Sequence, residues 1–434
     1  MSFDVLQKKI IEKQNPTIAG LYARVEYVPE YILAKYTAQY GESLQAGVEA
    51  IYEFNRGLID ALCDVVPAVK PQSAYYENLG WRGMEMLEKT IQYARSKGLY
   101  VVADIKRGDI GATATAYSEG WLGKTVVGQS SFSTFDADCV TLNGYMGSDA
   151  ITPFLKDCEK YDKCVFALVR TSNKSAVDLQ DQMCGEKHIY EVMGELTEQW
   201  AGDFVGEYGY NRVGAVTGAT YPEQIKTLRA QLPHTFFLVP GYGAQGGTAE
   251  DVQYAFDANG RGAIVNSSRG IMCAWKKTGH NGEDYQQAAR DAAIAMREDI
   301  CRFITIQSRG RAAVAIQKLC QISSIEKLNT DAVSIWLEAG ELAQAAQVGQ
   351  FVNIKCGEGL LLRRPISICR AEDTRLNVVF EVRGEGTAWL AQRTVGEELD
   401  VLGPLGHGFA YPDGKVLVVG GGIGVPPMLN TAQK

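Results

Sequence analysis

Two aspartates flank a lysine within a short segment, residues 101–113, and these side chains have the chemistry of acid–base groups. If the segment begins as a β-strand, alternation places Asp104 and Lys106 on one face, and Asp109 lies on the loop beyond. Carboxylates on both sides of a lysine keep it charged even where burial disfavours charge. The three residues are candidate catalytic groups, and the alternative is an ordinary surface ladder of ion pairs.

A second group of candidates lies in two loops, residues 240–248 and 266–270, which are rich in glycine and serine. Glycines such as Gly243 let backbone N–H groups approach the oxygens of an anion. Arg269, directly after Ser268, supplies a fixed charge that can hold a phosphate through two hydrogen bonds. The loops form a candidate phosphate site, and the alternative is that they serve only as tight turns with an arginine on a solvated rim.

The elements that must position these residues alternate between short apolar runs and stretches of helical spacing. Eight such alternations predict an α/β fold of the (β/α)8 barrel type, ending in a helix near residues 285–305. In such a barrel, functional side chains lie at the C-terminal ends of the strands, where both groups of candidates fall. The expected strands are residues 17–21, 67–70, 99–104, 139–142, 165–169, 213–216, 236–239 and 263–265.

The character of the sequence changes after residue 307, where Ser-Arg-Gly-Arg forms a plausible hinge. Antiparallel strands are expected at residues 333–337, 351–354, 376–382 and 399–402. The predicted division of the chain is a barrel over residues 1–307, a linker over 308–314, a smaller antiparallel β-barrel over 315–413, and the truncated start of a dinucleotide-binding domain over 414–434.

Composition excludes several classes of function. The formal net charge of -8 argues against nucleic-acid and membrane-surface partners. Ten cysteines are scattered singly, with no pair spaced for a metal, so we expect reduced thiols, a cytoplasmic location and no metal site. A signal peptide is not expected at the N-terminus, and a run of about 20 apolar residues, the length needed to span a membrane, is absent from the sequence.

Residues 101–113 resemble the active-site signature of the orotidine 5'-phosphate decarboxylases. The resemblance extends over roughly residues 3–277 and matches the longer, bacterial type of that family. Residues 214–222, Gly-Ala-Val-Thr-Gly-Ala-Thr-Tyr-Pro, are characteristic of this type. The resemblance implies decarboxylation of orotidine 5'-phosphate to UMP in pyrimidine biosynthesis, without a metal or organic cofactor.

The resemblance also implies roles for individual residues. Lys106 protonates the C6 carbanion, Asp104 lies near the departing carboxylate, and Asp109 reaches the site of a neighbouring subunit, so a homodimer with shared active sites is expected. Lys70 corresponds to a lysine that contacts the ribose, and Ser172 to a serine that bonds to the pyrimidine. The other residues expected to bind substrate are Thr113, Gly243, Gln245, Ser268 and Arg269, with Gln245 bridging phosphate and base.

One position departs from the family pattern. The first strand of the barrel ordinarily ends in Gly-Leu-Asp-Pro, but Tyr22 stands here in place of the aspartate. A tyrosine is neutral and bulkier, so we expect Lys70 to lose its partner and the ribose pocket to be partly filled. A second hypothesis follows, in which the barrel is catalytically weakened and serves to bind a nucleotide or partner protein.

The chain after residue 315 resembles the electron-transfer subunit of bacterial dihydroorotate dehydrogenase, a ferredoxin reductase-like flavoprotein. Arg-Arg-Pro-Ile-Ser-Ile at residues 363–368 and Gly-Glu-Gly-Thr at residues 384–387 carry the resemblance. It implies that FAD contacts Arg364, Pro365, Ser367, Gly386 and Thr387. Residues 418–427 resemble the opening of a dinucleotide-binding domain, so we expect a truncated fusion. A third hypothesis is flavin electron transfer with the dehydrogenase catalytic subunit as partner.

Overall fold

The computed structural model describes residues 2–22, 24–202, 204–243, 245–307, 316–347, 349–357 and 362–406. The chain divides into two compact units, residues 1–309 and 310–434. Most of the first unit and the strands of the second are described. The predicted linker at 308–314 and the predicted dinucleotide segment at 414–434 lie outside the described residues, so both remain predictions.

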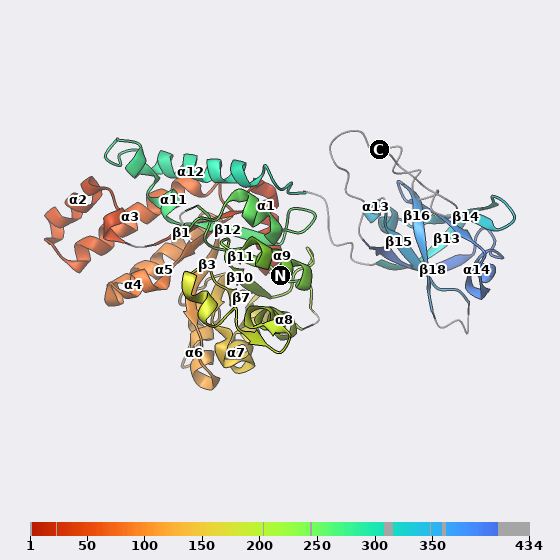
Figure 1. The fold of residues 1–434 in the computed structure, drawn as a ribbon, viewed down its shortest axis with the longest axis horizontal. Helices are drawn as coiled ribbons and strands as arrows, with labels where there is room; N and C mark the ends of the chain where they lie inside the picture. Colours follow the sequence, from red (N-terminus) through yellow and green to blue (C-terminus); the bar gives the residue numbers. More distant parts are fainter. Residues whose placement is uncertain are drawn as a thin grey trace. The chain divides into compact units, whose positions relative to one another are not determined.

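The first unit is a barrel of eight parallel strands among the described residues, closed in the order β1-β12-β11-β10-β7-β6-β3-β2 (Figure 1). Each of the eight expected runs forms one of these strands. The strands are β1 (Thr17–Leu21), β2 (Ala68–Pro71), β3 (Tyr100–Arg107), β6 (Cys139–Leu142), β7 (Cys164–Arg170), β10 (Val213–Thr217), β11 (Phe237–Val239) and β12 (Ala263–Ser267). The expected (β/α)8 barrel is confirmed.

Apolar packing closes one end of this barrel. The helix α1 (Ser2–Lys13) places Phe3 against two further aromatic side chains, with ring centroids 4.9 Å from Phe166 and 5.0 Å from Phe236. Phe236 lies directly before β11, so the cluster fills the N-terminal end of the strands. The C-terminal ends are left to carry the polar groups, as is usual in such barrels.

Helices cover the outside of the barrel (Figure 1). The longest described helix, α3 (Leu44–Leu62), begins after Ser43, whose side chain accepts a hydrogen bond from Ala46 N, and it buries Ile51, Phe54 and Leu58. The other described α-helices that follow α1 in the unit are α2 (Glu30–Tyr40), α4 (Ser73–Glu77), α5 (Gly80–Ser96), α6 (Gly111–Trp121), α7 (Ser148–Tyr161), α8 (Ile189–Ala201), α9 (Pro222–Gln231), α10 (Ala249–Val252), α11 (Arg269–Met272) and α12 (Tyr285–Ile300).

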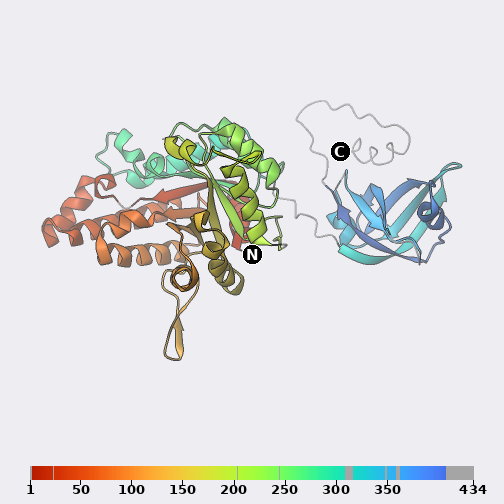
Figure 2. The same cartoon turned by 60° about the horizontal axis from the view of Figure 1, so that its bottom comes forward.

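Two short hairpins were not predicted. The first joins β4 (Thr125–Val127) to β5 (Ser130–Phe132), and Figure 2 shows it as an orange ribbon projecting from the barrel unit. The second joins β8 (Met183–Cys184) to β9 (Lys187–His188) in the loop after β7. Both hairpins are exposed and very short, so they lack the apolar periodicity from which a strand is recognised.

The second unit is a closed antiparallel barrel, in the order β13-β14-β17-β16-β15-β18 among the described residues. The antiparallel barrel expected here is confirmed, although β13 and β16 were not among the expected strands. The strands are β13 (Ile316–Lys327), β14 (Ala332–Glu338), β15 (Phe351–Ile354), β16 (Arg364–Glu372), β17 (Arg375–Glu381) and β18 (Glu398–Leu405), with helices α13 (Glu341–Ala345) and α14 (Glu385–Leu390).

All ten cysteines are free thiols, and six of them are buried. Among the helices that the structure describes, none is long and apolar enough to cross a membrane.

Candidate active site

Asp104 lies near the C-terminal end of β3 and is held by three side chains. Its Oδ1 accepts hydrogen bonds from Lys106 Nζ at 2.5 Å and from Thr141 Oγ1 at 2.8 Å. Its Oδ2 accepts a hydrogen bond from Lys70 Nζ at 2.6 Å. The structure thus brings Asp104 and Lys106 together, as alternation along the strand predicted, and adds Lys70 from the neighbouring strand β2.

These groups are held in their charged forms. Burial opposes the charge of Asp104, but Lys70 and Lys106 outweigh it and hold the pKa of Asp104 far below its usual range. Burial also opposes the charge of Lys70, yet Asp104 and Tyr22 reverse this effect and raise the pKa of Lys70. The Lys70 side chain is 3% exposed and that of Lys106 is 46% exposed. Lys106 is therefore the cation of this cluster that is open to solvent or ligand.

The backbone at Lys106 departs from an ordinary strand. Its φ angle is +47°, and the pairing of β3 with β6 shifts register between Ala103 and Arg107. Thr141 of β6 supports this bulge, because its Oγ1 accepts a hydrogen bond from Lys106 N at 3.0 Å. A left-handed φ is costly for a residue with a side chain, so the bulge concentrates strain at the candidate proton donor.

Tyr22 does not leave Lys70 without a partner. Lys70 Nζ lies 5.3 Å from the centroid of the Tyr22 ring and pairs with Asp104 on its other side. The ring of Tyr22 also packs against Tyr75, with centroids 5.0 Å apart, and Tyr22 N donates a hydrogen bond to Met272 Sδ. The expectation that Lys70 loses its partner is therefore wrong, because the adjacent strand supplies the carboxylate. The Tyr22 ring occupies space beside the lysine.

Asp109 and Thr113 lie apart from this cluster. Asp109 Oδ1 accepts a hydrogen bond from its neighbour Ile110 N at 2.8 Å. No ion pair joins Asp109 to Lys106 within the part of the chain that the structure describes. Thr113 is exposed on the first turn of α6. A single chain thus assembles two of the three candidate catalytic residues and leaves the half-buried Asp109 outside the cluster.

The loops after β7 and β11 approach each other around Gly241. A Cβ added there would lie 3.2 Å from both Ser172 Cβ and Gln245 Oε1, so these side chains border the same small space. Gly241 has a φ of +103°, which favours glycine. Gly243 has a φ of +69° and donates a backbone hydrogen bond to Gly247 O at 2.8 Å. The structure therefore brings Ser172 and Gln245 together.

The loop after β12 approaches the end of β1. A Cβ added at Gly20 would lie 1.9 Å from Ser268 Oγ, so only glycine permits this contact. Arg269 follows at the first position of α11, and its side chain is exposed. The charge of Arg269 is therefore accessible at the C-terminal end of the barrel, as the candidate phosphate site requires.

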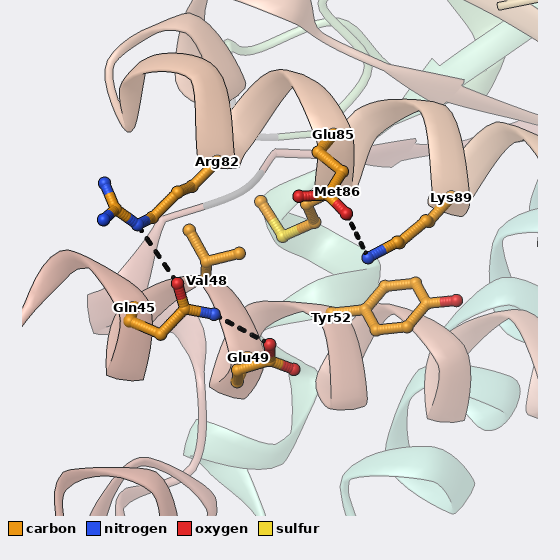
Figure 3. Close-up of a pocket in the computed structure, with 8 residues that line it drawn as sticks. All are labelled: Gln45, Val48, Glu49, Tyr52, Arg82, Glu85, Met86 and Lys89. Atoms are coloured by element: carbon orange, nitrogen blue, oxygen red, sulfur yellow. Dashed lines mark hydrogen bonds and ion pairs between the residues drawn. The ribbon is translucent and has the colours of Figure 1, made fainter. Parts of the chain in front are cut away.

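A shallow pocket lies elsewhere, between α3 and α5 on the outside of the barrel (Figure 3). Its polar side chains bond to one another: Arg82 Nε donates to Gln45 Oε1 at 3.1 Å, and Lys89 pairs with Glu85 at 2.6 Å. None of the residues named above lines it. The lining residues are Gln45, Val48, Glu49, Tyr52, Arg82, Glu85, Met86 and Lys89.

The residues implicated in flavin binding lie in the second unit. Arg364 begins β16, and its side chain covers Gly386 so closely that a Cβ there would lie 2.5 Å from Arg364 Nε. Thr387 Oγ1 accepts hydrogen bonds from the backbone N–H groups of Arg383 and Gly384, and so caps α14. Pro365 and Ser367 are exposed on β16. The structure brings Arg364 and the Gly386 turn together.

The fold and the cluster around Asp104 define a (β/α)8-barrel enzyme with a lysine–carboxylate centre. The family model described as "Orotidine 5'-phosphate decarboxylase / HUMPS family" matches residues 53–279. The chain belongs to this family. Among the described residues, no cluster of three or more potential metal ligands occurs.

Relatives that bear the name orotidine 5'-phosphate decarboxylase are similar over most of their length. The protein from Caldicellulosiruptor bescii is 39% identical over 297 residues, which cover 68% of this chain and 97% of the relative. The protein from Clostridium perfringens strain 13 is 42% identical over 301 residues, which cover 69% of this chain and 98% of the relative.

A solved structure shows the same likeness. The OMP decarboxylase of Leishmania donovani superposes with a TM-score of 0.53 at 29% identity, covering 70% of this chain and 98% of that chain. Both kinds of likeness cover about the share of the chain that the barrel unit occupies.

Proposed function

We propose that the barrel unit decarboxylates orotidine 5'-phosphate to UMP in pyrimidine biosynthesis, with Lys106 as the proton donor. The observation that carries this proposal is the contact of Lys106 with Asp104 in a chain of this family. The relatives at about 40% identity support the same reaction. No cofactor or metal is needed for the proposed step.

Loss of CO2 from C6 of the pyrimidine leaves an electron pair on a ring carbon with no adjacent sink. A fixed positive charge next to that carbon stabilises the carbanion, and the same ammonium can then deliver a proton. Lys106 suits both tasks because Asp104 keeps it in place while nearly half of its side chain stays exposed. Lys70, buried against the other carboxylate oxygen, fixes Asp104.

Asp104 would face the carboxylate that leaves. Repulsion between the two anions is relieved when CO2 departs, which favours the transition state over the bound substrate. The pKa of Asp104 is held far below its usual range, so the group stays anionic at neutral pH and can act in this way.

Remote contacts would hold the substrate. We assign the pyrimidine to Ser172 and Gln245, the ribose to Lys70, and the phosphate to Arg269. Binding energy from the phosphate can then be used to fix the reacting ring against Lys106. The remaining residues proposed to bind substrate are Thr113, Gly243 and Ser268.

The reaction is tested by adding orotidine 5'-phosphate to the purified protein in the presence of a metal chelator. We expect loss of the pyrimidine absorbance together with stoichiometric UMP and CO2. Binding of UMP without turnover would instead support the second hypothesis, a weakened barrel that serves as a nucleotide-binding module. The observation that favours this second hypothesis is the position of the Tyr22 ring beside Lys70.

Asp109 would complete the site of a second copy of the chain. Its separation from Lys106 within one chain supports this assignment, because the catalytic set is otherwise incomplete. Mixing inactive Lys106→Ala and Asp109→Ala subunits should restore activity, since one site in the mixed dimer regains both residues. Equal inactivity before and after mixing would argue against shared sites.

We propose FAD binding for the second unit, on the evidence of the Arg364–Gly386 contact. The close approach of a guanidinium to a glycine turn suits a pyrophosphate, because both the charge and the bare backbone can contact its oxygens. Bound FAD would supply one- and two-electron transfer. Arg364 would hold the phosphates and the exposed Ser367 would bond to the flavin chain.

The flavin proposal is tested by the absorbance spectrum of the full chain after addition of FAD and gel filtration. A retained flavin spectrum that Arg364→Ala abolishes is the expected result. If flavin is retained, the catalytic subunit of dihydroorotate dehydrogenase is the partner to test by co-purification. A protein that elutes without flavin would contradict the proposal.

A further inference from the structure

Arg170 ends β7, the strand that leads directly into Thr171 and Ser172. Its side chain is 0% exposed, and Arg170 and Arg261 are the largest fully buried side chains among the described residues. A buried guanidinium is costly unless its donors are paired. Its hydrogen-bond partners therefore indicate the role of this arginine.

One set of partners comes from the loop after Ser172. Arg170 Nη1 donates to Thr171 O at 3.1 Å and to Gln180 Oε1 at 3.2 Å, and Nη2 pairs with Asp181 at 3.1 Å. Gln180 in turn accepts from Thr171 N at 2.9 Å and donates to Thr171 Oγ1 at 2.8 Å. The residue directly before Ser172 is thereby fixed at its N, O and Oγ1 atoms.

The other partners come from the turn after β10 and from the first turn of α9. Arg170 Nε donates to Gln224 Oε1 at 2.5 Å, and its Cζ lies 3.9 Å from the centroid of the Tyr221 ring. The backbone O of Arg170 accepts from Gly218 N at 2.7 Å. A Cβ added at Gly218 would lie 2.8 Å from Ser172 N and Cα. Arg170 thus joins the two segments that enclose Ser172.

We propose that Arg170 is a positioning residue that fixes Ser172 beside Gln245, where the serine meets the pyrimidine ring. Arg170 contacts no reacting atom; it acts through Thr171. The proposal rests on the function proposed above for Ser172. Arg261 offers a matched contrast, since it is only 2% exposed and lies just before β12, at the opposite end of the strands, where it donates hydrogen bonds to Gln307 O.

The test compares Arg170→Met with Arg261→Met in the full chain, at a temperature where circular dichroism shows both variants folded. Turnover of orotidine 5'-phosphate is measured together with inhibition by UMP, which carries the base, and by ribose 5-phosphate, which lacks it. Arg170→Met should lower kcat/KM by about 100-fold, because a small displacement of a positioning contact is this costly.

Arg170→Met should also weaken inhibition by UMP while inhibition by ribose 5-phosphate changes by less than about twofold. Arg261→Met should lower the melting temperature but leave kcat/KM within about twofold. Equal losses in the two variants, or equal weakening of both inhibitors by Arg170→Met, would overturn the proposal. Arg170→Lys should not rescue activity, since an ammonium cannot replace the planar fork.

A second variant keeps the test decisive if Arg170→Met fails to fold. Gln180 is half-buried, and Gln180→Ala removes its two hydrogen bonds with Thr171. This change should lower kcat/KM by about tenfold. When either change is combined with Ser172→Ala, kcat/KM should fall little below that of Ser172→Ala alone, because the effects of coupled residues are not additive. Full additivity would overturn the positioning role, whereas a neutral Ser172→Ala would show instead that the function proposed for Ser172 has failed.

Discussion

Lys70 and Lys106 share one carboxylate but hold it from different environments. Lys70 is almost wholly buried and bonds to Asp104 Oδ2, whereas Lys106 is half exposed and bonds to Oδ1. A buried ammonium that is paired with a carboxylate gives up its proton only at a high cost, so Lys70 is suited to act as a fixed charge. Lys106 is suited to move a proton, because its exposed ammonium can exchange the contact with Asp104 for one with substrate.

Asp104→Asn tests the fixed part of this cluster. The change leaves Lys70 buried without a counter-charge, so we expect the barrel to lose about 3–5 kcal/mol of unfolding free energy in urea. Asp291→Asn, a change at an exposed aspartate of α12, should cost less than about 0.5 kcal/mol. Similar stabilities of Asp104→Asn and the unmodified protein would contradict the geometry.

The pH dependence of the pair's contribution to stability in the unmodified protein follows from the directions of the two pKa shifts. The lowered pKa of Asp104 gives stability that is present above the usual carboxyl pKa of about 3.9 and lost as pH falls towards the folded value. The raised pKa of Lys70 gives stability that is present below its usual value of about 10.4 and lost as pH rises through the folded value. In the unmodified protein the contribution of this pair to the free energy of unfolding should therefore stay constant from about pH 5 to pH 9, as measured by urea unfolding at several pH values.

Tyr22→Asp tests whether the tyrosine limits the enzyme. An aspartate there frees the space beside Lys70 and offers a charged acceptor to the ribose, so kcat/KM should rise by about tenfold. Tyr22→Phe removes only the hydroxyl and serves as the control, with kcat/KM expected to change less than about threefold. No gain in the aspartate variant would show that Tyr22 does not impair substrate binding.

At the scale of elements, the bulge in β3 depends on its neighbour β6. Thr141 bonds to Asp104 Oδ1 and to Lys106 N, so one hydroxyl fixes both the carboxylate and the strained backbone. Thr141→Val keeps the shape of the side chain but removes the hydroxyl, which should cost about 1–3 kcal/mol of stability.

The same change should lower kcat by roughly tenfold, because Lys106 then loses its defined position. Thr141→Ser retains the hydroxyl and should keep both stability and kcat close to those of the unmodified protein. Thermal unfolding and steady-state turnover measure the two effects. A valine variant with unchanged kcat would show that the bulge does not position Lys106.

The barrel strands were predictable because parallel strands buried on both faces read as continuous apolar runs. The hairpin of β4 and β5 was not, because its short strands are exposed. Strand alternation predicted the contact of Asp104 with Lys106, but no local pattern reveals the left-handed backbone at Lys106. The partner of Lys70 followed from the adjacency of β2 and β3, and the prediction failed because it considered only the end of β1.

Other parts of the site depended on contacts between distant segments. The meeting of Ser172 and Gln245 follows from barrel order, since loops after strands lie at one end. The roles of Arg170 and Thr141 do not follow from barrel order. An arginine or a threonine at a strand end is common, and only the folded chain shows its partners. The role of Asp109 in the site of a second copy of the chain remains a prediction.

At the scale of the whole molecule, the functions proposed for the two units are tested by separate experiments. The 297 residues that match the Caldicellulosiruptor bescii relative cover 97% of that protein and 68% of this chain, so we predict that decarboxylation does not need the second unit. A chain that ends at residue 309 should keep kcat/KM within about twofold and retain the melting transition of the barrel. A large loss of activity would mean that the second unit supports the site.

The central claim, that Lys106 is the proton donor of a decarboxylase, is tested most directly by Lys106→Ala. Turnover of orotidine 5'-phosphate should fall by at least about 1000-fold, the scale of a lost general acid with its stabilising charge, while UMP still binds. Lys97→Ala, a change at a distant exposed lysine, should retain full activity. A Lys106→Ala protein with kcat near that of the unmodified chain would contradict the account.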